Sequence, residues 1–77
     1  MNRQQLERVL NAFEVRPDAY DLQGDADEAY CIAKEADGWH VFYSERGLRS
    51  GDRLFRTEGD ACDVLLELIA RDPLTRA

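Results

Sequence analysis

The sequence predicts an α+β fold: a three- to four-stranded antiparallel meander flanked in sequence by an N-terminal and a C-terminal helix, both packed on one face. Two observations support this. Apolar residues recur at helical spacing near both ends of the chain, and two strand-like runs between them meet at Asp37-Gly38. Asp-Gly is typical of a hairpin, because the turn that matches strand twist needs positive φ at both central residues. With 77 residues, the chain has room for a single domain, residues 1–77.

The N-terminal helix is indicated by apolar side chains at i, i+3, i+4 and i+7, which we expect to face the core: Leu6, Val9, Leu10 and Phe13. Asn2 and Gln5 have the spacing of a capping box at its start. The helix should end before Arg16, because Pro17 disfavours α geometry in the residue ahead of it.

The strands are assigned from alternation and from the hairpin. A short edge strand at 19–22 precedes an acidic turn, and an Asp37-Gly38 turn pairs Ile32 with Tyr43. The larger apolar set then faces the helices: Tyr30, Ile32, Trp39, Val41 and Tyr43. The other face holds Cys31, Ala33, His40, Phe42 and Ser44. With both helices on one side, we expect Phe42 to be exposed, as a partner contact or the seam of a weak homodimer.

The rest of the chain supplies a third strand and the second helix. A loop at 46–51 leads to a strand at 52–57. Thr57 and Asp60 have capping spacing, and a helix with a wide apolar arc should continue through Arg71 until Pro73 ends it. The direction of the strands places the acidic turn at 24–28 and the arginine loop at 46–50 at the same end of the sheet.

The charge distribution disfavours nucleic acid as the main partner. The net charge is −6, whereas binding to a phosphate backbone depends on clustered Lys and Arg. The charge is uneven, with six acids between 14 and 28 and four arginines between 46 and 56. No apolar run is long enough to span a bilayer and the N-terminus lacks a signal peptide's apolar region, so we expect a cytoplasmic protein without membrane partners.

No group of residues indicates catalysis, and we expect no enzyme activity and no cofactor. His40 is the only histidine, which excludes a His-based metal site within one chain, and we expect its ring to be solvated on a sheet face. Ser44 lies four residues along the same strand, about 13 Å away, too far to act with it. Asp25, Asp27 and Glu28 lack the alternation of a calcium loop. We therefore predict no metal site.

Two further residue groups have a structural and a functional interpretation. The arginines of residues 46–56 can salt-bridge to the acidic turn or bind phosphates, and we favour the first: Arg46, Arg49, Arg53 and Arg56. Cys31 and Cys62 are far apart in sequence, outside any Cys-x-x-Cys motif. We interpret them as small buried hydrophobic residues rather than as a disulfide.

Three segments resemble a group of very small bacterial proteins. They are Trp39-His-Val-Phe-Tyr-Ser-Glu-Arg-Gly-Leu-Arg-Ser-Gly51, Phe55-Arg-Thr-Glu-Gly-Asp-Ala-Cys62 and Arg71-Asp-Pro-Leu-Thr-Arg76. These segments resemble immunity proteins encoded beside polymorphic secreted toxins, including toxins that hydrolyse NAD. The resemblance covers roughly residues 29–76, while the first 28 residues do not contribute to it. It implies a stoichiometric inhibitor without catalysis of its own.

We therefore predict that the chain binds a cognate toxin and blocks its active site. The predicted contact surface is the acidic turn with the adjoining loop: Tyr20, Asp21, Asp25, Asp27, Glu28, Glu45, Arg46 and Arg49. Two alternatives stay open, a small nucleotide- or nucleic-acid-binding protein that uses residues 46–56, and a non-catalytic subunit of a larger complex. We expect a monomer or a weak homodimer.

Overall fold

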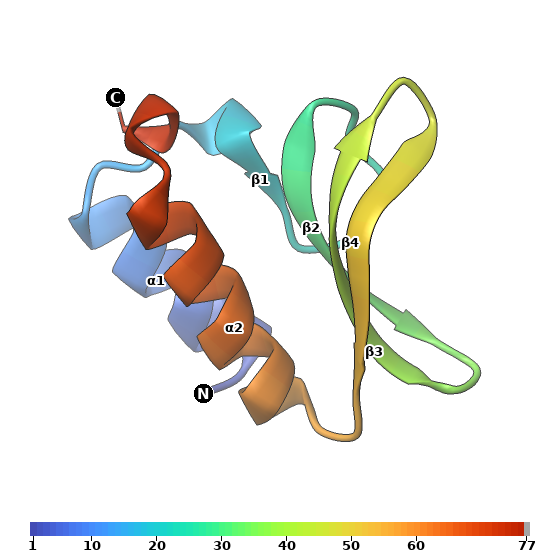
Figure 1. The fold of residues 1–77 in the computed structure, drawn as a ribbon. Helices are drawn as coiled ribbons and strands as arrows, with labels where there is room; N and C mark the ends of the chain where they lie inside the picture. The colour runs from blue at the N-terminus through green and yellow to red at the C-terminus, as the bar shows by residue number, and fades with distance from the viewer. Residues whose placement is uncertain (77) are drawn as a thin grey trace.

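The computed structural model describes residues 1–76 and has a helix layer packed against one sheet (Figure 1). In chain order the elements are α1 (Arg3–Ala12), η1 (Pro17–Ala19), β1 (Tyr20–Asp21), β2 (Ala29–Glu35), β3 (Gly38–Glu45), β4 (Leu48–Phe55), α2 (Glu58–Arg71) and η2 (Pro73–Thr75). The strand order is β1-β2-β3-β4. The predicted α+β class is confirmed, with a mostly antiparallel meander. The exception is β1, which runs parallel to β2.

The helix ends follow from local hydrogen bonding. Asn2 and Gln5 form the predicted capping box. α1 ends at Ala12; beyond it Glu14 has a positive φ of 57°, and the Val15 N–H donates to the Leu10 carbonyl at 3.0 Å. This Schellman-type ending directs Val15 into the core. It leaves Phe13, predicted to be a core residue, 57% exposed, so that prediction is wrong.

The first hairpin has a different turn from the predicted one. Glu35 pairs with Gly38 and Ile32 with Val41, so the central turn residues are Ala36 and Asp37. The shift of two positions leaves each residue on its predicted face, because side chains alternate with a period of two. Gly38 is needed elsewhere: a Cβ there would lie 2.7 Å from the Phe55 carbonyl oxygen of β4.

The predicted loop at 46–51 is also wrong, because β4 begins at Leu48. Arg46 and Gly47 alone form the turn, with φ values of 53° and 78°, the left-handed pair that a type I′ hairpin requires. β4 has a bulge in which Gly51 and Asp52 lie opposite Phe42. The bulge places Arg49 and Asp52, three residues apart, on the same face of the strand.

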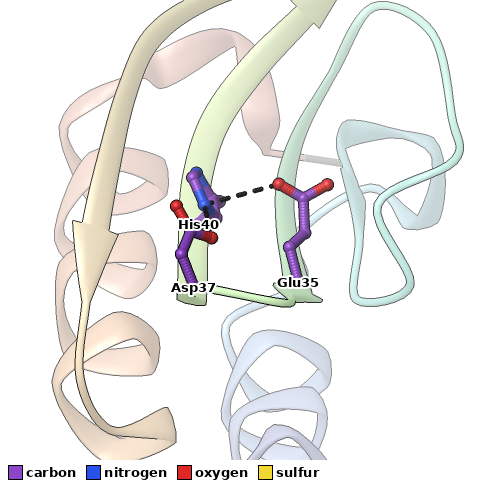
Figure 2. A group of neighbouring side chains, drawn as sticks. All are labelled: Glu35, Asp37 and His40. Carbon is purple, nitrogen blue, oxygen red and sulfur yellow. Dashed lines mark hydrogen bonds and ion pairs between the residues drawn. The ribbon is translucent and has the colours of Figure 1, made fainter.

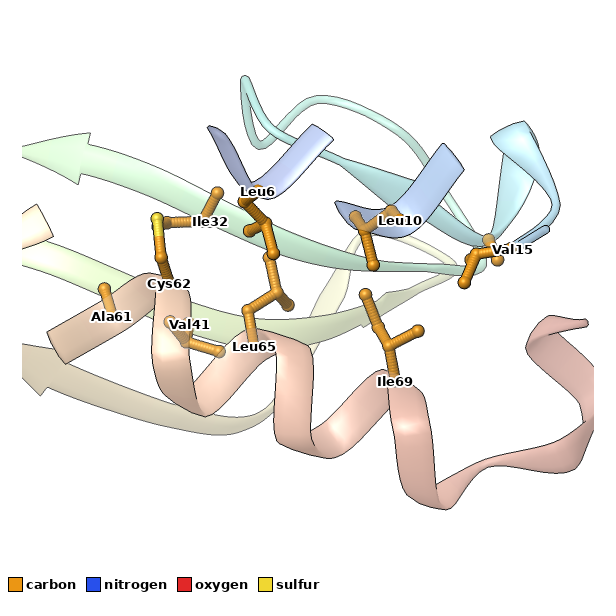
Figure 3. Packing of buried hydrophobic residues seen from close by; sticks show 10 residues of the cluster. Leu6, Leu10, Val15, Ile32, Val41, Ala61, Cys62, Leu65 and Ile69 are labelled. Atoms are coloured by element: carbon orange, nitrogen blue, oxygen red, sulfur yellow. The ribbon is translucent and has the colours of Figure 1, made fainter. Parts of the chain in front are cut away.

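The main core lies between the helices and the sheet (Figure 3). Its largest fully buried side chains include Leu6, Leu10, Ile32, Val41 and Leu65. The predicted helix-facing side of the sheet is thus confirmed for its central residues. Cys62 belongs to the same cluster.

The opposite face of the sheet is covered, which corrects the prediction for Phe42. Phe42 is only 2% exposed and packs with Ala29, Cys31 and Ala33 in a second cluster. The connection 22–28 between two parallel strands is too short for a helix, so it crosses this face directly. Gly24 permits the close approach, since a Cβ there would lie 2.7 Å from the Ala33 Cβ.

The remaining cover over Phe42 is the Arg49 guanidinium, 4.0 Å from the ring centroid. An exposed aromatic surface for self-association at Phe42 is therefore absent, and the homodimer seam proposed there loses its basis. Cys31 and Cys62 are both free and buried, as predicted. They belong to separate clusters on opposite sides of the sheet, so they do not pair.

Candidate functional site

The crossover 22–28 is held by one carboxylate. Asp21 accepts hydrogen bonds from the backbone N–H groups of Gln23 at 2.8 Å, Asp25 at 3.2 Å and Ala26 at 2.8 Å. Asp21 was predicted to contact a partner, but its oxygens are used within the chain. Its role in this geometry is to fix the backbone that presents the neighbouring acids.

The far end of the same segment meets the second hairpin. Asp27 accepts a hydrogen bond from the Arg46 backbone N–H at 2.6 Å. The prediction that the acidic turn and the 46–50 region share one end of the sheet is confirmed by this contact. We define the acidic end as Asp27, Glu28 and Glu45.

The carboxylates of the acidic end form no ion pair among the described residues. All three side chains belong to exposed residues. Within residues 1–76, no Lys, Arg or His nitrogen lies within 4.0 Å of a carboxylate oxygen of Asp27, Glu28 or Glu45. Asp25, earlier on the crossover, is also exposed and forms no ion pair within residues 1–76. These acids can therefore interact with an external cation without first breaking an ion pair.

The other predicted contact residues lie elsewhere. Tyr20 packs against the main core, and its hydroxyl lies 3.5 Å from Asn11 Oδ1 on α1. Burial, and then the charge of Glu7, raise the pKa of Tyr20. Arg49 belongs to a second charged group on the crossover side of the sheet, where it pairs with Glu35 and Asp52. The predicted salt bridges from the arginines of residues 46–56 to the acidic turn are therefore wrong for the described residues 1–76. The structure thus joins Asp27 to Arg46 by a hydrogen bond, with Glu28 and Glu45 next to them in the chain. Asp25 lies with Asp21, to which its N–H donates, and the guanidinium of Arg49 is held by Glu35.

The second charged group, the histidine cluster, consists of Glu35, Asp37, His40, Arg49 and Asp52. Figure 2 shows Glu35, Asp37 and His40 of this group. His40 Nε2 lies 2.7 Å from Asp37 Oδ1 and 3.4 Å from Glu35 Oε1, while Nδ1 lies 2.8 Å from Asp52 Oδ1. Arg49 donates two hydrogen bonds to Glu35, at 2.9 and 2.6 Å. The His40 side chain is only 14% exposed, so the prediction of a solvated ring is wrong.

The cluster fits a protonated imidazole. Hydrogen bonds to Asp37 and then Asp52 raise the pKa of His40. The hydrogen bond from Arg49 lowers the pKa of Glu35, and the one from His40 lowers the pKa of Asp37. Only the imidazolium can donate from both ring nitrogens at once. Its positive charge and that of Arg49 offset much of the charge of the three carboxylates.

A metal ion fits the histidine cluster less well than a proton does. Glu35, Asp37 and His40 each place a ligand atom within 4.8 Å of the others. However, both Glu35 oxygens already accept from Arg49, and the 2.7 Å between His40 Nε2 and Asp37 Oδ1 is a hydrogen-bond spacing. Tetrahedral ligands about 2.0–2.1 Å from zinc would lie about 3.3 Å apart. We interpret the cluster as an ion-pair network.

Sequence reasoning missed the histidine cluster. Asp37 and His40 are three apart around the first turn, which was a usable signal. Asp52 and Arg49 join only through the β4 bulge, which alternation does not reveal.

The two thiols do not offer a nucleophile either, because burial raises the pKa of Cys31 to about 11 and also raises the pKa of Cys62.

The fold and surface thus define a small two-layer α+β domain with one paired and one unpaired acidic region. Comparison with protein-family models, curated proteins and solved structures finds no match for this chain. Among residues 1–76, neither helix has the length and apolar character required to cross a bilayer.

Proposed function

We propose that the protein is a non-catalytic inhibitor that binds an electropositive partner protein through its acidic end. It would act in the cytoplasm, as an immunity protein does when it blocks a secreted toxin. One observation carries the proposal: Asp27, Glu28 and Glu45 are exposed and form no ion pair within residues 1–76, on backbone fixed by hydrogen bonds. The resemblance of residues 29–76 to immunity proteins agrees with it.

The physical basis is electrostatic complementarity on a preorganised surface. An exposed cluster of one sign accelerates encounter with a surface of the opposite sign. The hydrogen bonds of Asp21 and Asp27 order the backbone before binding, which reduces the entropy cost of association. The chain exposes 4990 Å². A standard interface of about 800 Å² per partner would cover about a sixth of it.

The partner is expected to be an enzyme that acts on an anionic substrate. A cleft that binds NAD or nucleic acid must attract phosphate groups, so it carries positive potential. The carboxylates of the acidic end can be attracted by the same potential and occupy the cleft. A domain of this size can therefore inhibit by covering the entrance, without any chemistry of its own.

The alternative based on residues 46–56 is weakened by the position of Arg49. Its guanidinium is held by Glu35 and covers Phe42, so it is not available to a phosphate without breaking both contacts. Arg46, Arg53 and Arg56 are exposed, but they lie around a hairpin turn and along an edge strand rather than at a phosphate-binding helix start.

The test is co-purification of the chain with the product of a neighbouring toxin-like gene, followed by that protein's activity assay with increasing amounts of this chain. We expect a one-to-one complex and loss of activity at equimolar inhibitor. Unchanged activity at a tenfold excess, or no retained partner, would contradict the proposal.

A further inference from the structure

A small pocket adjoins the acidic end on the helix side of the sheet. Its volume is about 110 Å³, and its walls include Tyr30 and Tyr43, Glu28 of the acidic end, and Asp72 and Thr75 near the C-terminus. The pocket has room for the end of one long side chain and is smaller than the sites of about 300–1,000 Å³ that hold drug-sized ligands.

The walls of the pocket are held in place before any ligand arrives. The Tyr30 hydroxyl donates to Asp72 Oδ2 at 2.8 Å, and the Leu74 N–H donates to Asp72 Oδ1 at 3.0 Å. Tyr30 and Tyr43 meet edge to face, with centroids 5.0 Å apart. Burial, and then the hydrogen bond to Asp72, raise the pKa of Tyr30 to about 12, so this donor stays protonated.

The pocket walls carry two carboxylates, Glu28 and Asp72, against one arginine, Arg16. Burial is the main reason that the pKa of Tyr43 is raised, and four carboxylates contribute in turn: Glu45, Glu28, Asp72 and Asp27. Of these four, Glu28 and Asp72 line the pocket itself. Arg16 also lines the pocket, but its guanidinium lies 3.5 Å from Asp18, which offsets its charge.

We propose that this pocket receives the cationic end of one Arg or Lys side chain from the partner. This inference rests on the proposed function, and it names the anchor of the same binding surface. Aromatic rings and carboxylates together suit a guanidinium or ammonium group, through cation–π contact and charge-assisted hydrogen bonds. Binding energy in protein interfaces concentrates where such an anchor fills a pocket, and Arg is among the commonest anchors.

The direct test needs no partner. Nα-acetyl-arginine amide is titrated into the ¹⁵N-labelled protein, and Nα-acetyl-citrulline amide, of the same shape without the charge, is the control probe. We expect the arginine probe to produce saturable shifts of the Tyr43, Leu74 and Thr75 amides, with at least threefold weaker binding of citrulline. Equal binding of both probes, or no saturable shift at these amides, overturns the inference.

Two variants sharpen this titration. Glu28→Gln removes a wall charge from an exposed residue and should weaken arginine binding at least twofold, whereas Asp63→Asn, an equal charge change on the outer face of α2, should leave it unchanged. Tyr43→Leu removes the aromatic ring and should also weaken arginine binding at least twofold. The dispersion of its NMR spectrum shows whether this variant is still folded. If both wall variants bind arginine as the unaltered protein does, the pocket is not the site.

The arginine titration and the inhibition assay test the two proposals separately. A protein that binds and inhibits its partner but does not bind the arginine probe retains the proposed function and refutes the pocket. A protein that binds the probe in this pocket but retains no partner refutes the proposed function alone.

Discussion

The histidine cluster and the acidic end are built from the same residue types but differ in what their carboxylates contact. In the cluster, Glu35, Asp37 and Asp52 surround His40 and Arg49 at distances of 2.6–3.5 Å. At the acidic end, Asp27 and its neighbours have no such cation among residues 1–76. The comparison teaches that the number of acids does not identify a binding surface. Their pairing decides which of them can meet a partner.

The two regions also differ in what they do for the fold. The histidine cluster joins β2, the first turn, β3 and β4, and it holds Arg49 over Phe42. Its charges therefore support packing. Among residues 1–76, the side-chain hydrogen bond of the acidic end is the one that Asp27 accepts from the Arg46 backbone, and its three residues are exposed. Changes in the first region should affect stability, and changes in the second should affect binding.

The largest effect is expected at Phe42, beneath the histidine cluster. Phe42→Ala removes a buried ring and should cost about 3–5 kcal/mol of unfolding free energy. Urea denaturation followed by circular dichroism measures it. A cost below about 1 kcal/mol would show that Phe42 is not covered by Arg49 and the crossover. Phe13→Ala, at a residue that is 57% exposed, is the matched control and should change little.

Asp21 should have the next largest effect, because it orders the crossover from within. Asp21→Ala leaves three backbone N–H groups without their acceptor, and we expect a loss of about 1–3 kcal/mol. Hydrogen exchange should become faster at Ala26 before it changes in the helices. Asp25→Ala is the matched control. Asp25 lies on the same crossover, and its side chain accepts no hydrogen bond within residues 1–76, so this change should leave the stability unaltered.

A smaller effect is expected from pH. The folded pKa of His40 is raised, so its contribution is complete below the unfolded value of about 6.5 and is lost as pH rises through the folded value. Glu35 and Asp37 have lowered pKa values, so their contributions are present above their unfolded values and are lost on acidification. Unfolding at pH 5.5–8.5 should therefore show stability falling toward alkaline pH, and His40→Gln should flatten this decline. An unchanged decline in His40→Gln would contradict this account of the cluster.

The smallest effect on stability is expected at the acidic end itself. Glu28→Gln and Glu45→Gln remove exposed charges that form no ion pair in the described part of the chain, and the unfolding free energy should stay within about 0.5 kcal/mol. Thermal unfolding at low and moderate salt measures it. A larger loss would show that these acids have a structural role and are not reserved for binding.

Local patterns predicted much of this fold. Alternation assigned the correct faces to Ile32 and Val41, and capping residues located both helix starts. The register was less predictable, because Gly38 serves a close approach of β4 rather than the centre of the turn. The shared end of the acidic and arginine segments followed from strand direction alone.

The errors arose where distant segments decide the environment of a residue. Phe42 is buried because a seven-residue crossover lies on its face, and this path depends on Asp21 and Gly24. The histidine cluster forms because a bulge turns Asp52 toward His40. Neither contact produces a periodic pattern in the sequence. Sequence reasoning therefore could not tell which acidic side chains form ion pairs and which are exposed for binding.

The most direct test of the central claim is the association rate with the retained partner, measured by stopped flow at several salt concentrations. The double variant Glu28→Lys/Glu45→Lys is compared with Glu7→Lys/Asp63→Lys, which changes the net charge equally on the exposed faces of the helices. We expect the first to associate at least tenfold more slowly, with a weaker dependence on salt, and the second to change the rate less than threefold. Equal slowing by both variants would mean that net charge alone governs the encounter, which would contradict an acidic end built for binding.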